Sequence, residues 1–401
     1  MNKTVCVVGL GYIGLPTAAI LADKGFIVHG VDILKSKIET INSGKSYFYE
    51  PGLKQLIKKN INNKRLTANL SPKEADIFII AVPTPFKKNY TPNIDFVIAS
   101  IESILPYIKK NNIIIIESTI PVGTTKKVEE LLKNNNLDTS NIHIAHCPER
   151  VLPGNIIKEL KENDRIVGGT NLESTKIIAN FYKSFVRGEV FITDDKTAEL
   201  AKLTENSFRD VNIAFANELS MICEREKINV WDLIKLANKH PRVNILNPGA
   251  GVGGHCIAVD PWFIIKSNEN ESKIIKKARE VNLNKTKWVI EKIKKSALSY
   301  EKKKNKKPTI CCMGLSYKPD VNDLRESPSI QIVQSLLEQN FKVIAVEPNI
   351  DKHKNISIVK YEEGIRKADI IVWLVAHKEF KFIKRNDDLD FCGISETIYK
   401  T

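Results

Sequence analysis

One short stretch, KTVCVVGLGYIG at residues 3–14, constrains the fold more than any other part of this chain. Its first half is a continuous apolar run, which is typical of a buried parallel strand. The glycines Gly9, Gly11 and Gly14 follow in the pattern G-x-G-x-x-G and open a helix. The first glycine permits a tight turn, the second lets a pyrophosphate approach the backbone, and the third lets helix and strand pack closely. In this setting the pattern predicts dinucleotide binding; the alternative is a nucleotide-shaped fold that binds nothing.

Asp32 specifies the dinucleotide. It ends the next strand, FIVHGVD, 18 residues after Gly14. A carboxylate at this position can accept a hydrogen bond from a ribose hydroxyl and would repel a 2′-phosphate. The sequence therefore predicts NAD as cofactor, in preference to NADP.

Strand and helix patterns then alternate as far as residue 195, which predicts βαβ units and a parallel sheet. The expected strands are 75–83, 112–119, 142–148, 165–169 and 189–193, and the expected helices are 94–108, 124–134 and 173–186.

The character of the sequence changes after residue 195. Residues 197–227 contain neither Gly nor Pro and have apolar residues at helical spacing, which predicts one long helix. A lysine-rich segment near 299–308 is expected to be a linker, and a second α/β set follows it. The remaining expected elements are helices at 230–240, 272–298 and 328–339 and strands at 308–315, 342–348 and 368–376.

The expected fold is α/β, with two Rossmann-like, doubly wound parallel-sheet domains joined by a helical middle. The domain boundaries expected from these patterns are 1–195 for NAD binding, 196–298 for the helical central and dimerisation domain, and 299–401 for a C-terminal α/β domain.

Composition narrows the class of partner. The chain has 401 residues, 42% hydrophobic and 27% charged, and no apolar run near the eighteen or so residues that a membrane helix needs. Its seven cysteines show no repeated zinc spacing, and the N-terminus does not read as a signal peptide, so we expect a cytoplasmic protein without a metal site. The net charge of +14 raises nucleic acid as a partner. Because the excess lysines cluster at 273–295 and 301–308 without the aromatic-basic interleaving that binds single strands, anionic small molecules are favoured instead.

The loop AGVGGHCIAVDP, residues 250–261, surrounds one thiol with small residues. Gly251, Gly253 and Gly254 let the backbone come close to another molecule, and Asp260 follows Cys256 by four residues. A free cysteine is usually a small buried hydrophobe, and reactive thiols depend on their surroundings. The loop alone leaves both readings open.

Other polar residues gather where the expected strands end. Thr84 and Thr119, in AVPTP and ESTIPVGTT, follow two strands at the edge where ligands bind in open α/β sheets. Glu149 and Arg150 follow the strand at 142–148. The remaining candidates are Lys202, Asn206 and Arg209, which share a face of the long helix, and His240 and Arg242, which follow a helix. Taken singly, each is as readily an ordinary turn or surface residue.

Together, a thiol, an amine and carboxylates beside an NAD site suit a four-electron oxidation of an alcohol to an acid. A thiolate attacks the aldehyde formed first, and the resulting thiohemiacetal gives up a second hydride to become a thioester. Water activated by a carboxylate then releases the acid. A two-electron dehydrogenase has no use for the thiol.

Several long motifs resemble the UDP-sugar dehydrogenases across nearly the whole chain. They are GLGYIGLPTA, AVPTP, ESTIPVGTT, CPERVLPGN, AELAKLTENSFRDVNIAFANEL, NKHPRVN, GVGGHCIAVDPWF and YKPDVNDLRESPS.

The resemblance implies a role for each matching residue. Cys256 would be the nucleophile, Lys202 a general acid and base at the 6-hydroxyl with Asn206 polarising the same oxygen, and Asp260, Glu149 and Thr119 would assist thioester hydrolysis. The implied NAD contacts are Gly9, Gly11, Tyr12, Ile13, Gly14, Asp32, Thr84, Thr119 and Arg325. The implied UDP-sugar contacts are Arg150, Val151, Lys202, Asn206, Arg209, His240, Arg242, Gly253, Tyr317 and Lys318. The resemblance further implies that Arg242 serves a neighbouring subunit, with the helical middle as interface of a homodimer or larger assembly.

Departures from the UDP-glucose branch narrow the substrate. His255 and Val259 stand where that branch typically has serine and lysine, and RVLPG replaces its leucine-glycine stretch. Both changes resemble the N-acetylhexosamine branch, which implies UDP-N-acetylmannosamine, with UDP-N-acetylglucosamine as the alternative. Two other classes remain, a catalytically silent nucleotide-sugar sensor and a basic nucleic-acid-binding protein. The C-terminal FCGISETIYKT looks short beside the family, which suggests that a final segment is missing.

Overall fold

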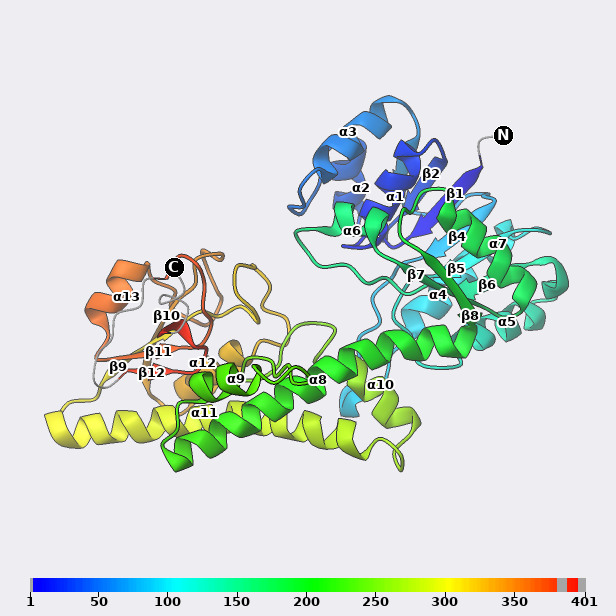
Figure 1. Ribbon diagram of the computed structural model, residues 1–401. Helices are drawn as coiled ribbons and strands as arrows, with labels where there is room; N and C mark the ends of the chain where they lie inside the picture. The colour runs from blue at the N-terminus through cyan, green and yellow to red at the C-terminus, as the bar shows by residue number, and fades with distance from the viewer. Residues whose placement is uncertain (1–2, 381–387, 396–401) are drawn as a thin grey trace. The chain divides into compact units, whose positions relative to one another are not determined.

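The computed structural model describes residues 3–380 and 388–395 and divides into two compact units (Figure 1). The first comprises Met1–Thr204 with Trp262–Ser267, and the second comprises Glu205–Pro261 with Asn268–Thr401. The end of the C-terminal FCGISETIYKT, residues 396–401, lies outside the described residues. Within the described ranges, no helix combines the length and the apolar character needed to cross a membrane.

The first unit is built on one sheet, in which eight described strands have the order β3-β2-β1-β4-β5-β6-β7-β8. The strands are β1 (Thr4–Val8), β2 (Ile27–Val31), β3 (Leu66–Asn69), β4 (Ile77–Ile80), β5 (Ile113–Ile116), β6 (His143–His146), β7 (Arg165–Gly169) and β8 (Val190–Asp194). The helices are α1 (Gly14–Asp23), α2 (Lys35–Asn42), α3 (Leu53–Asn62), α4 (Asp95–Ile104), α5 (Thr124–Asn134), α6 (Ile156–Glu162) and α7 (Leu172–Lys183), with 3-10 turns at Lys88–Tyr90, Leu105–Tyr107 and Thr139–Asn141. The sequence analysis had no prediction for α2, α3 or β3.

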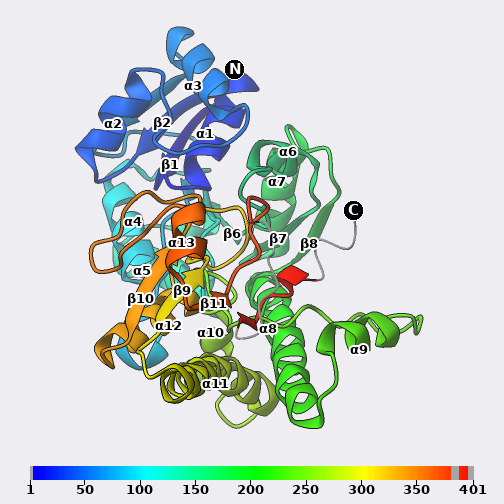
Figure 2. The ribbon, with the colours of Figure 1, turned by 90° about the vertical axis from the view of Figure 1, so that its left-hand side faces the viewer.

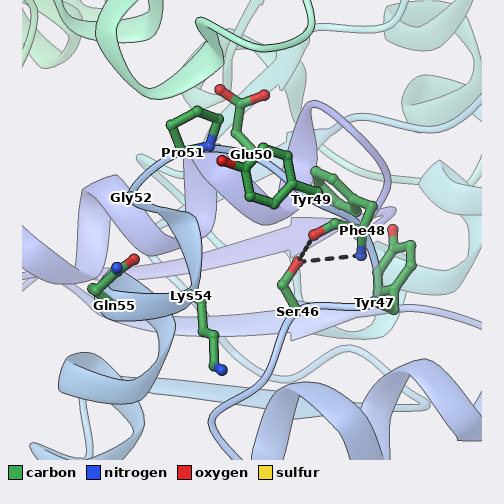
Figure 3. Close-up of a pocket in the computed structure, with 9 residues that line it drawn as sticks. All are labelled: Ser46, Tyr47, Phe48, Tyr49, Glu50, Pro51, Gly52, Lys54 and Gln55. Carbon is green, nitrogen blue, oxygen red and sulfur yellow. Dashed lines mark hydrogen bonds between the residues drawn. The ribbon is translucent and has the colours of Figure 1, made fainter. Parts of the chain in front are cut away.

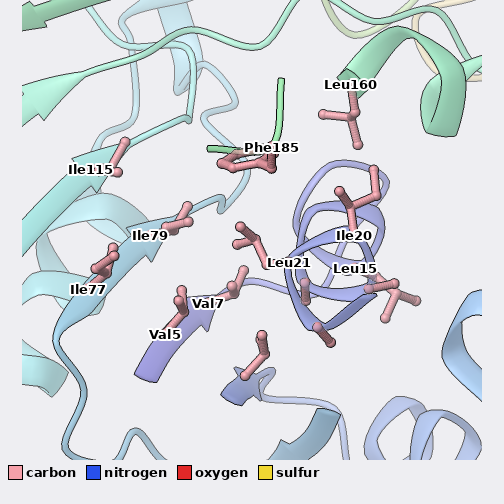
Figure 4. Packing of buried hydrophobic residues seen from close by; sticks show 14 of the residues in the cluster. Val5, Val7, Leu15, Ile20, Leu21, Ile77, Ile79, Ile115, Leu160 and Phe185 are labelled. Carbon is pink, nitrogen blue, oxygen red and sulfur yellow. The ribbon is translucent and has the colours of Figure 1, made fainter. Parts of the chain in front are cut away.

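The sheet buries both of its faces, which is why its strands are continuously apolar. Val5, Ile77 and Ile115 point to the side covered by α1 and α7, as Figure 4 shows. Their neighbours along the strands, such as Phe78 and Ile114, point to the opposite side, where α4 and α5 pack. The core is therefore two layers of branched side chains with the sheet between them.

One strand departs from the expected parallel arrangement. β7 pairs antiparallel with β6, with Ala145 opposite Gly169 and His146 opposite Gly168, while β8 is parallel to β7. The chain turns back at the carboxyl end of β6 instead of crossing the sheet, so no crossover helix imposes a parallel direction. The α/β fold class is confirmed, with this reversal as a correction to a purely parallel sheet.

The long helix predicted after residue 195 is confirmed as α8 (Asp195–Glu226). In the second unit it lies beside α11 (Lys273–Lys304), as Figures 1 and 2 show. A four-stranded parallel sheet of order β10-β9-β11-β12 forms the C-terminal part of the same unit. The other elements are α9 (Val230–Ala237), α10 (Asp260–Ser267), β9 (Thr309–Met313), α12 (Pro328–Glu338), β10 (Lys342–Val346), α13 (Tyr361–Lys367), β11 (Ile370–Trp373) and β12 (Leu389–Asp390).

The expected linker at 299–308 is mostly helix, so that prediction was wrong. α11 continues to Lys304 and ends at Asn305, which has a left-handed φ of 48°. Lysine is a good helix former, and the Tyr300 hydroxyl donates to Asp369 Oδ1 at 3.0 Å, which fixes the last turns to the C-terminal sheet.

The turn after β9 repeats the turn after β1. Gly314 has φ +92° and Gly9 has φ +94°, and each donates its N–H to the end of the neighbouring strand at 2.8 Å, to Val346 O and Val31 O. A carboxylate closes each turn: Asp32 accepts from Leu10 N at 3.3 Å, and Glu347 accepts from Leu315 N at 2.8 Å. The two sequences, GLGYIG and GLSYKP, differ at the second and third glycines.

Candidate active site

The glycine turn after β1 is shaped as the sequence predicted. A Cβ added to Gly14 would lie 1.8 Å from Gly9 O, and one added to Gly9 would lie 2.5 Å from Ala81 O. A Cβ added to Gly11 would have no atom within 4 Å. Two of the glycines are therefore required by the packing of the chain itself, whereas the backbone at Gly11 faces open space. This is the cradle that a pyrophosphate needs, so the residues present fit a dinucleotide.

Asp32 lies beside that turn and is buried. Besides Leu10 N, its carboxylate accepts from Leu34 N at 3.0 Å and from Lys37 Nζ at 3.0 Å. Sequence reasoning missed Lys37. A cation in the first turn of the helix that follows Asp32 could have indicated this contact.

An aromatic segment, Ser46–Glu50, packs on the same turn and was also missed. The Tyr47 hydroxyl donates to Leu10 O at 2.5 Å, and the Phe48 ring lies 4.5 Å from the ring of Tyr12, centroid to centroid. Figure 3 shows this segment, which with Pro51, Gly52, Lys54 and Gln55 lines a cavity of about 440 Å³. Ile13, expected to contact NAD, stands directly before α1.

Glu50, at the end of that segment, is buried and holds another predicted loop. Its carboxylate accepts from Gly154 N and Ile156 N, both at 2.8 Å. The segment therefore links the glycine turn to the chain that follows Arg150 and Val151.

Thr84 and Thr119 follow β4 and β5 at the carboxyl edge of the sheet, as expected, and both are partly exposed. Ser118 joins the two loops: its hydroxyl accepts from Val82 N at 2.9 Å and donates to Val82 O at 2.8 Å. The sequence had shown only that each threonine follows a strand.

Glu149 and Arg150 come just after β6. The Glu149 carboxylate is buried, accepts from Arg150 N at 2.8 Å and forms an ion pair with the buried guanidinium of Arg165. Arg150 donates from its own guanidinium to Asp164 O at 2.6 Å. The partly buried Val151 packs against the core.

Lys202 lies on α8 in the first unit and is partly exposed. One turn earlier, Glu199 accepts from Gly123 N at 2.5 Å and from Thr125 N at 2.7 Å, which ties α8 to the start of α5. Burial lowers the pKa of His146 to about 3, and the charge of Lys202 acts in the same direction. Lys202 thus faces a neutral imidazole.

In the second unit, Cys256 lies on the loop before α10 and is partly exposed. Its carbonyl accepts from Asp260 N at 2.8 Å. Asn206 Nδ2 donates to Asp260 Oδ2 at 2.6 Å, and both side chains are buried. The amide of Asn206 and the carboxylate of Asp260 are therefore paired, and the backbone of Cys256 is bonded to the residue that carries the carboxylate.

The structure explains the glycines of the cysteine loop differently from the sequence analysis, which expected them to leave room for another molecule. A Cβ at Gly251 would lie 2.3 Å from Thr286 Oγ1, and a Cβ at Gly253 or Gly254 would lie 2.8 Å from Tyr317. The chain itself occupies these positions. Thr286 also donates to Ala250 O at 3.0 Å, so α11 fixes the start of the loop.

Tyr317, Lys318 and Arg209 share one electrostatic environment with Cys256. Burial lowers the pKa of Lys318, and the charge of Arg209 acts in the same direction. Burial raises the pKa of Tyr317, and a Cys256 thiolate would raise it further. The charges of Arg209 and Cys256 thus act on both Tyr317 and Lys318, and the resemblance assigns all of these residues except Cys256 to the substrate.

Arg325, expected at the cofactor, is oriented by Asp323. Its Nη2 donates to Asp323 Oδ2 at 2.6 Å, and its carbonyl accepts from Gly254 N at 3.0 Å. His240 and Arg242 lie on an exposed turn after α9, where Arg242 N donates to His240 Nδ1 at 3.3 Å. Across the described ranges, no hydrogen bond or ion pair joins these two residues to the cysteine loop.

The predicted residues thus form two groups. The first unit holds Gly9, Gly11, Tyr12, Ile13, Gly14, Asp32, Thr84, Thr119, Glu149, Arg150, Val151 and Lys202, and the second holds Asn206, Arg209, His240, Arg242, Gly253, Cys256, Asp260, Tyr317, Lys318 and Arg325.

Comparison with known proteins gives matches along most of the chain. Three parts of the UDP-glucose/GDP-mannose dehydrogenase family match in order: the NAD binding domain at residues 3–186, the central domain at 196–284 and the UDP binding domain at 311–391.

Relatives and solved structures agree with these matches. The chain is 51% identical to the UDP-N-acetyl-D-mannosamine dehydrogenase of Campylobacter jejuni, over 98% of this chain and 99% of the relative. It is 46% identical to the NDP-N-acetyl-D-galactosaminuronic acid dehydrogenase of Ralstonia nicotianae, over 94% and 92%. The UDP-N-acetyl-mannosamine dehydrogenase structure from S. aureus superposes with a TM-score of 0.89 at 38% identity, covering 98% of this chain and 95% of that one. The chain therefore belongs to the UDP-glucose/GDP-mannose dehydrogenase family, whose members are NAD-dependent enzymes acting on nucleotide sugars.

Proposed function

We propose that this enzyme oxidises the C6 alcohol of UDP-N-acetyl-D-mannosamine to UDP-N-acetyl-D-mannosaminuronate, in four electrons, through a thioester on Cys256. The observation that carries the proposal is the second unit's grouping of Cys256 with the hydrogen-bonded pair Asn206–Asp260 and with the charges of Arg209 and Lys318. The reaction needs a thiol as nucleophile, a carboxylate oriented by an amide, and cations to bind the diphosphate, and these residue types are present. The relative at 51% identity supports the choice of sugar.

NAD, when bound in the glycine turn, supplies the hydride acceptor for both oxidations. The open backbone at Gly11 receives the pyrophosphate, and Asp32, with Lys37 at 3.0 Å, receives the ribose. Tyr12, Ile13, Thr84, Thr119 and Arg325 complete the expected contacts.

Lys202 takes the proton from the C6 hydroxyl, and Asn206 polarises the same oxygen. The Cys256 sulfur then bonds to the aldehyde carbon, and loss of a second hydride leaves a thioester. In hydrolysis, a water oxygen bonds to the acyl carbon and one water proton passes to Glu149, with Thr119 and Asp260 assisting. The C–S bond breaks and its electron pair returns to sulfur.

The substrate has three parts that the enzyme must hold at the same time: a diphosphate, a uracil and an acetamido sugar. Cations at Arg150, Arg209, Arg242 and Lys318 suit the anionic groups. The uncharged contacts are Val151, His240, Gly253 and Tyr317, with Lys202 and Asn206 at the reacting carbon.

A homodimer through the central helices completes the proposal. Phe208, Phe215 and Ile222 recur every seven residues on α8 and are 68%, 51% and 49% exposed. Leu236 of α9 is 70% exposed. A repeat of this spacing suits a helix that packs against a second copy of itself. Arg242, on its exposed turn, would then serve the partner's substrate.

The remaining proposals concern place and boundaries. None of the seven cysteines, all of which lie in the described ranges, forms a disulfide, which supports a reducing cytoplasm. We also propose that the working enzyme has three domains: the NAD-binding domain at 1–195, the helical central domain at 196–298 and the C-terminal α/β domain at 299–401.

The test is the NADH formed per sugar consumed, with the UDP forms of N-acetylmannosamine, N-acetylglucosamine, N-acetylgalactosamine and glucose supplied separately. Two NADH from the mannosamine sugar alone is the expected result, and Cys256→Ser is expected to form no uronate. One NADH per sugar contradicts the cysteine mechanism. No turnover with any sugar would favour the nucleotide-sugar sensor, and salt-sensitive binding of DNA or RNA would favour the nucleic-acid alternative.

A further inference from the structure

Behind Glu149 lies a buried cluster of polar side chains from five separate segments of the chain. Glu149 and Glu117 follow β6 and β5, Arg165 begins β7, Tyr182 lies on α7 and Thr17 on α1. All five are less than 9% exposed. The cluster contains two carboxyl groups and one guanidinium, so the two acids share a single cation.

The reversal of β7 places the cation. Continuing the register that sets His146 opposite Gly168 brings residue 149 opposite residue 165. Arg165 Nη1 accordingly donates to Glu149 Oε2, and Nη2 donates to Leu160 O at 3.1 Å. Its guanidinium also lies 5.3 Å from the ring centroid of Tyr182. A parallel β7 would have placed residue 165 at the opposite end of the strand pair.

The second acid is satisfied differently. Glu117 accepts from the Tyr182 hydroxyl at 2.7 Å and from Thr17 Oγ1 at 3.5 Å. Burial, followed by the charge of Glu149, raises the pKa of Glu117 to about 7, although Arg165, Tyr182 and Thr17 act in the opposite direction. The buried Cys147 thiol beside Tyr182 is held neutral, because burial raises its pKa to about 12. The Arg165 guanidinium thus pairs directly with Glu149, whereas two hydroxyl groups donate to Glu117.

We infer that Arg165 is a positioning residue for the hydrolytic half of the reaction: its guanidinium holds the Glu149 carboxylate in place from behind. The inference rests on the proposed function, in which Glu149 accepts a proton from water. Both Glu149 oxygens are fixed, one by Arg150 N and one by Arg165. Removing the cation leaves a buried carboxyl group that is driven towards its neutral form, which cannot accept that proton.

The experiment compares Arg165→Met and Arg165→Lys with the wild-type enzyme. Intact mass after acid quench measures the fraction of enzyme that carries the sugar on Cys256, and kcat is followed against pH. For Arg165→Met we expect the covalent adduct to accumulate, kcat at pH 7 to fall roughly 10- to 100-fold, and the ascending limb of the pH profile to move to higher pH. Arg165→Lys should restore most of kcat but retain more adduct than the wild type, because one ammonium cannot replace the fork of a guanidinium.

Arg279 provides the matched control. Like Arg165, it is 2% exposed, forms a buried ion pair, with Asp210, and leaves its Nε without a hydrogen-bond partner. Arg279→Met and Arg279→Lys should lower the melting temperature but leave the adduct fraction and the pH limb at wild-type positions. The same adduct in the Arg279 variants would refute a specific role for Arg165.

The outcomes separate the two proposals. A folded Arg165→Met enzyme with wild-type adduct and pH limb overturns the inference; if that variant does not fold, a wild-type adduct fraction in Arg165→Lys does so. A wild-type enzyme that forms one NADH per sugar contradicts the proposed function instead.

Discussion

Replacing Glu117 by glutamine should make stability less dependent on pH. The carboxyl group has a pKa of about 7 in the folded protein, mainly because it is buried, against 4.5 as its ordinary value. Between those two values the folded chain holds one more proton than the unfolded chain. Its stability therefore falls by about 1.4 kcal/mol for each pH unit, or roughly 3 kcal/mol across the window. The sign follows from the raised pKa: the contribution is complete below pH 4.5 and is lost as the pH rises to about 7.

Glutamine keeps the shape of the neutral acid and can still accept from Tyr182, but it cannot ionise. The free energy of unfolding of Glu117→Gln, minus that of the wild type, should rise by roughly 3 kcal/mol from pH 4.5 to 7 and then level off. Urea unfolding followed by circular dichroism at half-unit pH steps measures this difference. A difference that stays constant between pH 5 and 7 would refute the reasoning.

Glu347 supplies a control of opposite sign. Although burial works in the other direction, the hydrogen bond and charge of His377 lower its pKa to about 2. Its contribution is present above pH 4.5 and is lost only as the pH falls towards 2. Glu347→Gln should thus lower stability, and this loss should shrink as the pH falls towards 2.

Three further predictions use other parts of the structure. Gly14→Ala should prevent the glycine turn from forming, because its Cβ would lie 1.8 Å from a backbone oxygen. Gly11→Ala, where a Cβ meets no atom, should melt like the wild type yet bind NAD weakly. Melting curves and NAD titration distinguish the two variants, and equal melting temperatures would contradict the prediction. Phe215→Glu should convert a dimer to monomers, since each copy loses about 2 kcal/mol of apolar burial and gains a charge, and light scattering decides. Glu50→Ala removes both acceptors of the 154–156 backbone, so the KM for the UDP-sugar should rise about tenfold with kcat little changed; a fall in kcat alone would count against this role.

The sequence was most informative where structure depends on neighbouring residues. The glycine turn and Asp32 follow one another within a single strand–turn–helix–strand unit, so their spacing determines their geometry. The long helix α8 was equally clear, because 32 residues at helical spacing contain no breaker.

What sequence reasoning missed depends on residues that are distant along the chain. Periodicity records which face of a strand is buried and not its direction, so the reversal of β7 and the partner of Glu149 were invisible. Glu50 bonds to backbone about a hundred residues away. The lysines at 302–304 suit a solvated loop and a solvated helix equally, and the hydrogen bond from Tyr300 to Asp369 joins residues too far apart in sequence to be predicted. The cysteine-loop glycines were read as room for a ligand, whereas Thr286 and Tyr317 occupy that space.

The repeated turn after β9 bears on how many dinucleotides one chain binds during a reaction cycle. Ser316 and Pro319 replace two of the three glycines there, and the closing carboxylate of Glu347 is already taken up by the His377 ring at 3.1 Å. The turn after β9 thus lacks the open backbone and the available carboxylate of the turn after β1, so in the described part of the chain only the turn after β1 has the features of a dinucleotide cradle. In the proposed reaction, two oxidations of one sugar then require NADH to leave this cradle and a second NAD to bind there before the aldehyde is oxidised. The covalent bond to the Cys256 sulfur that we propose would keep the reactive aldehyde from escaping during this exchange.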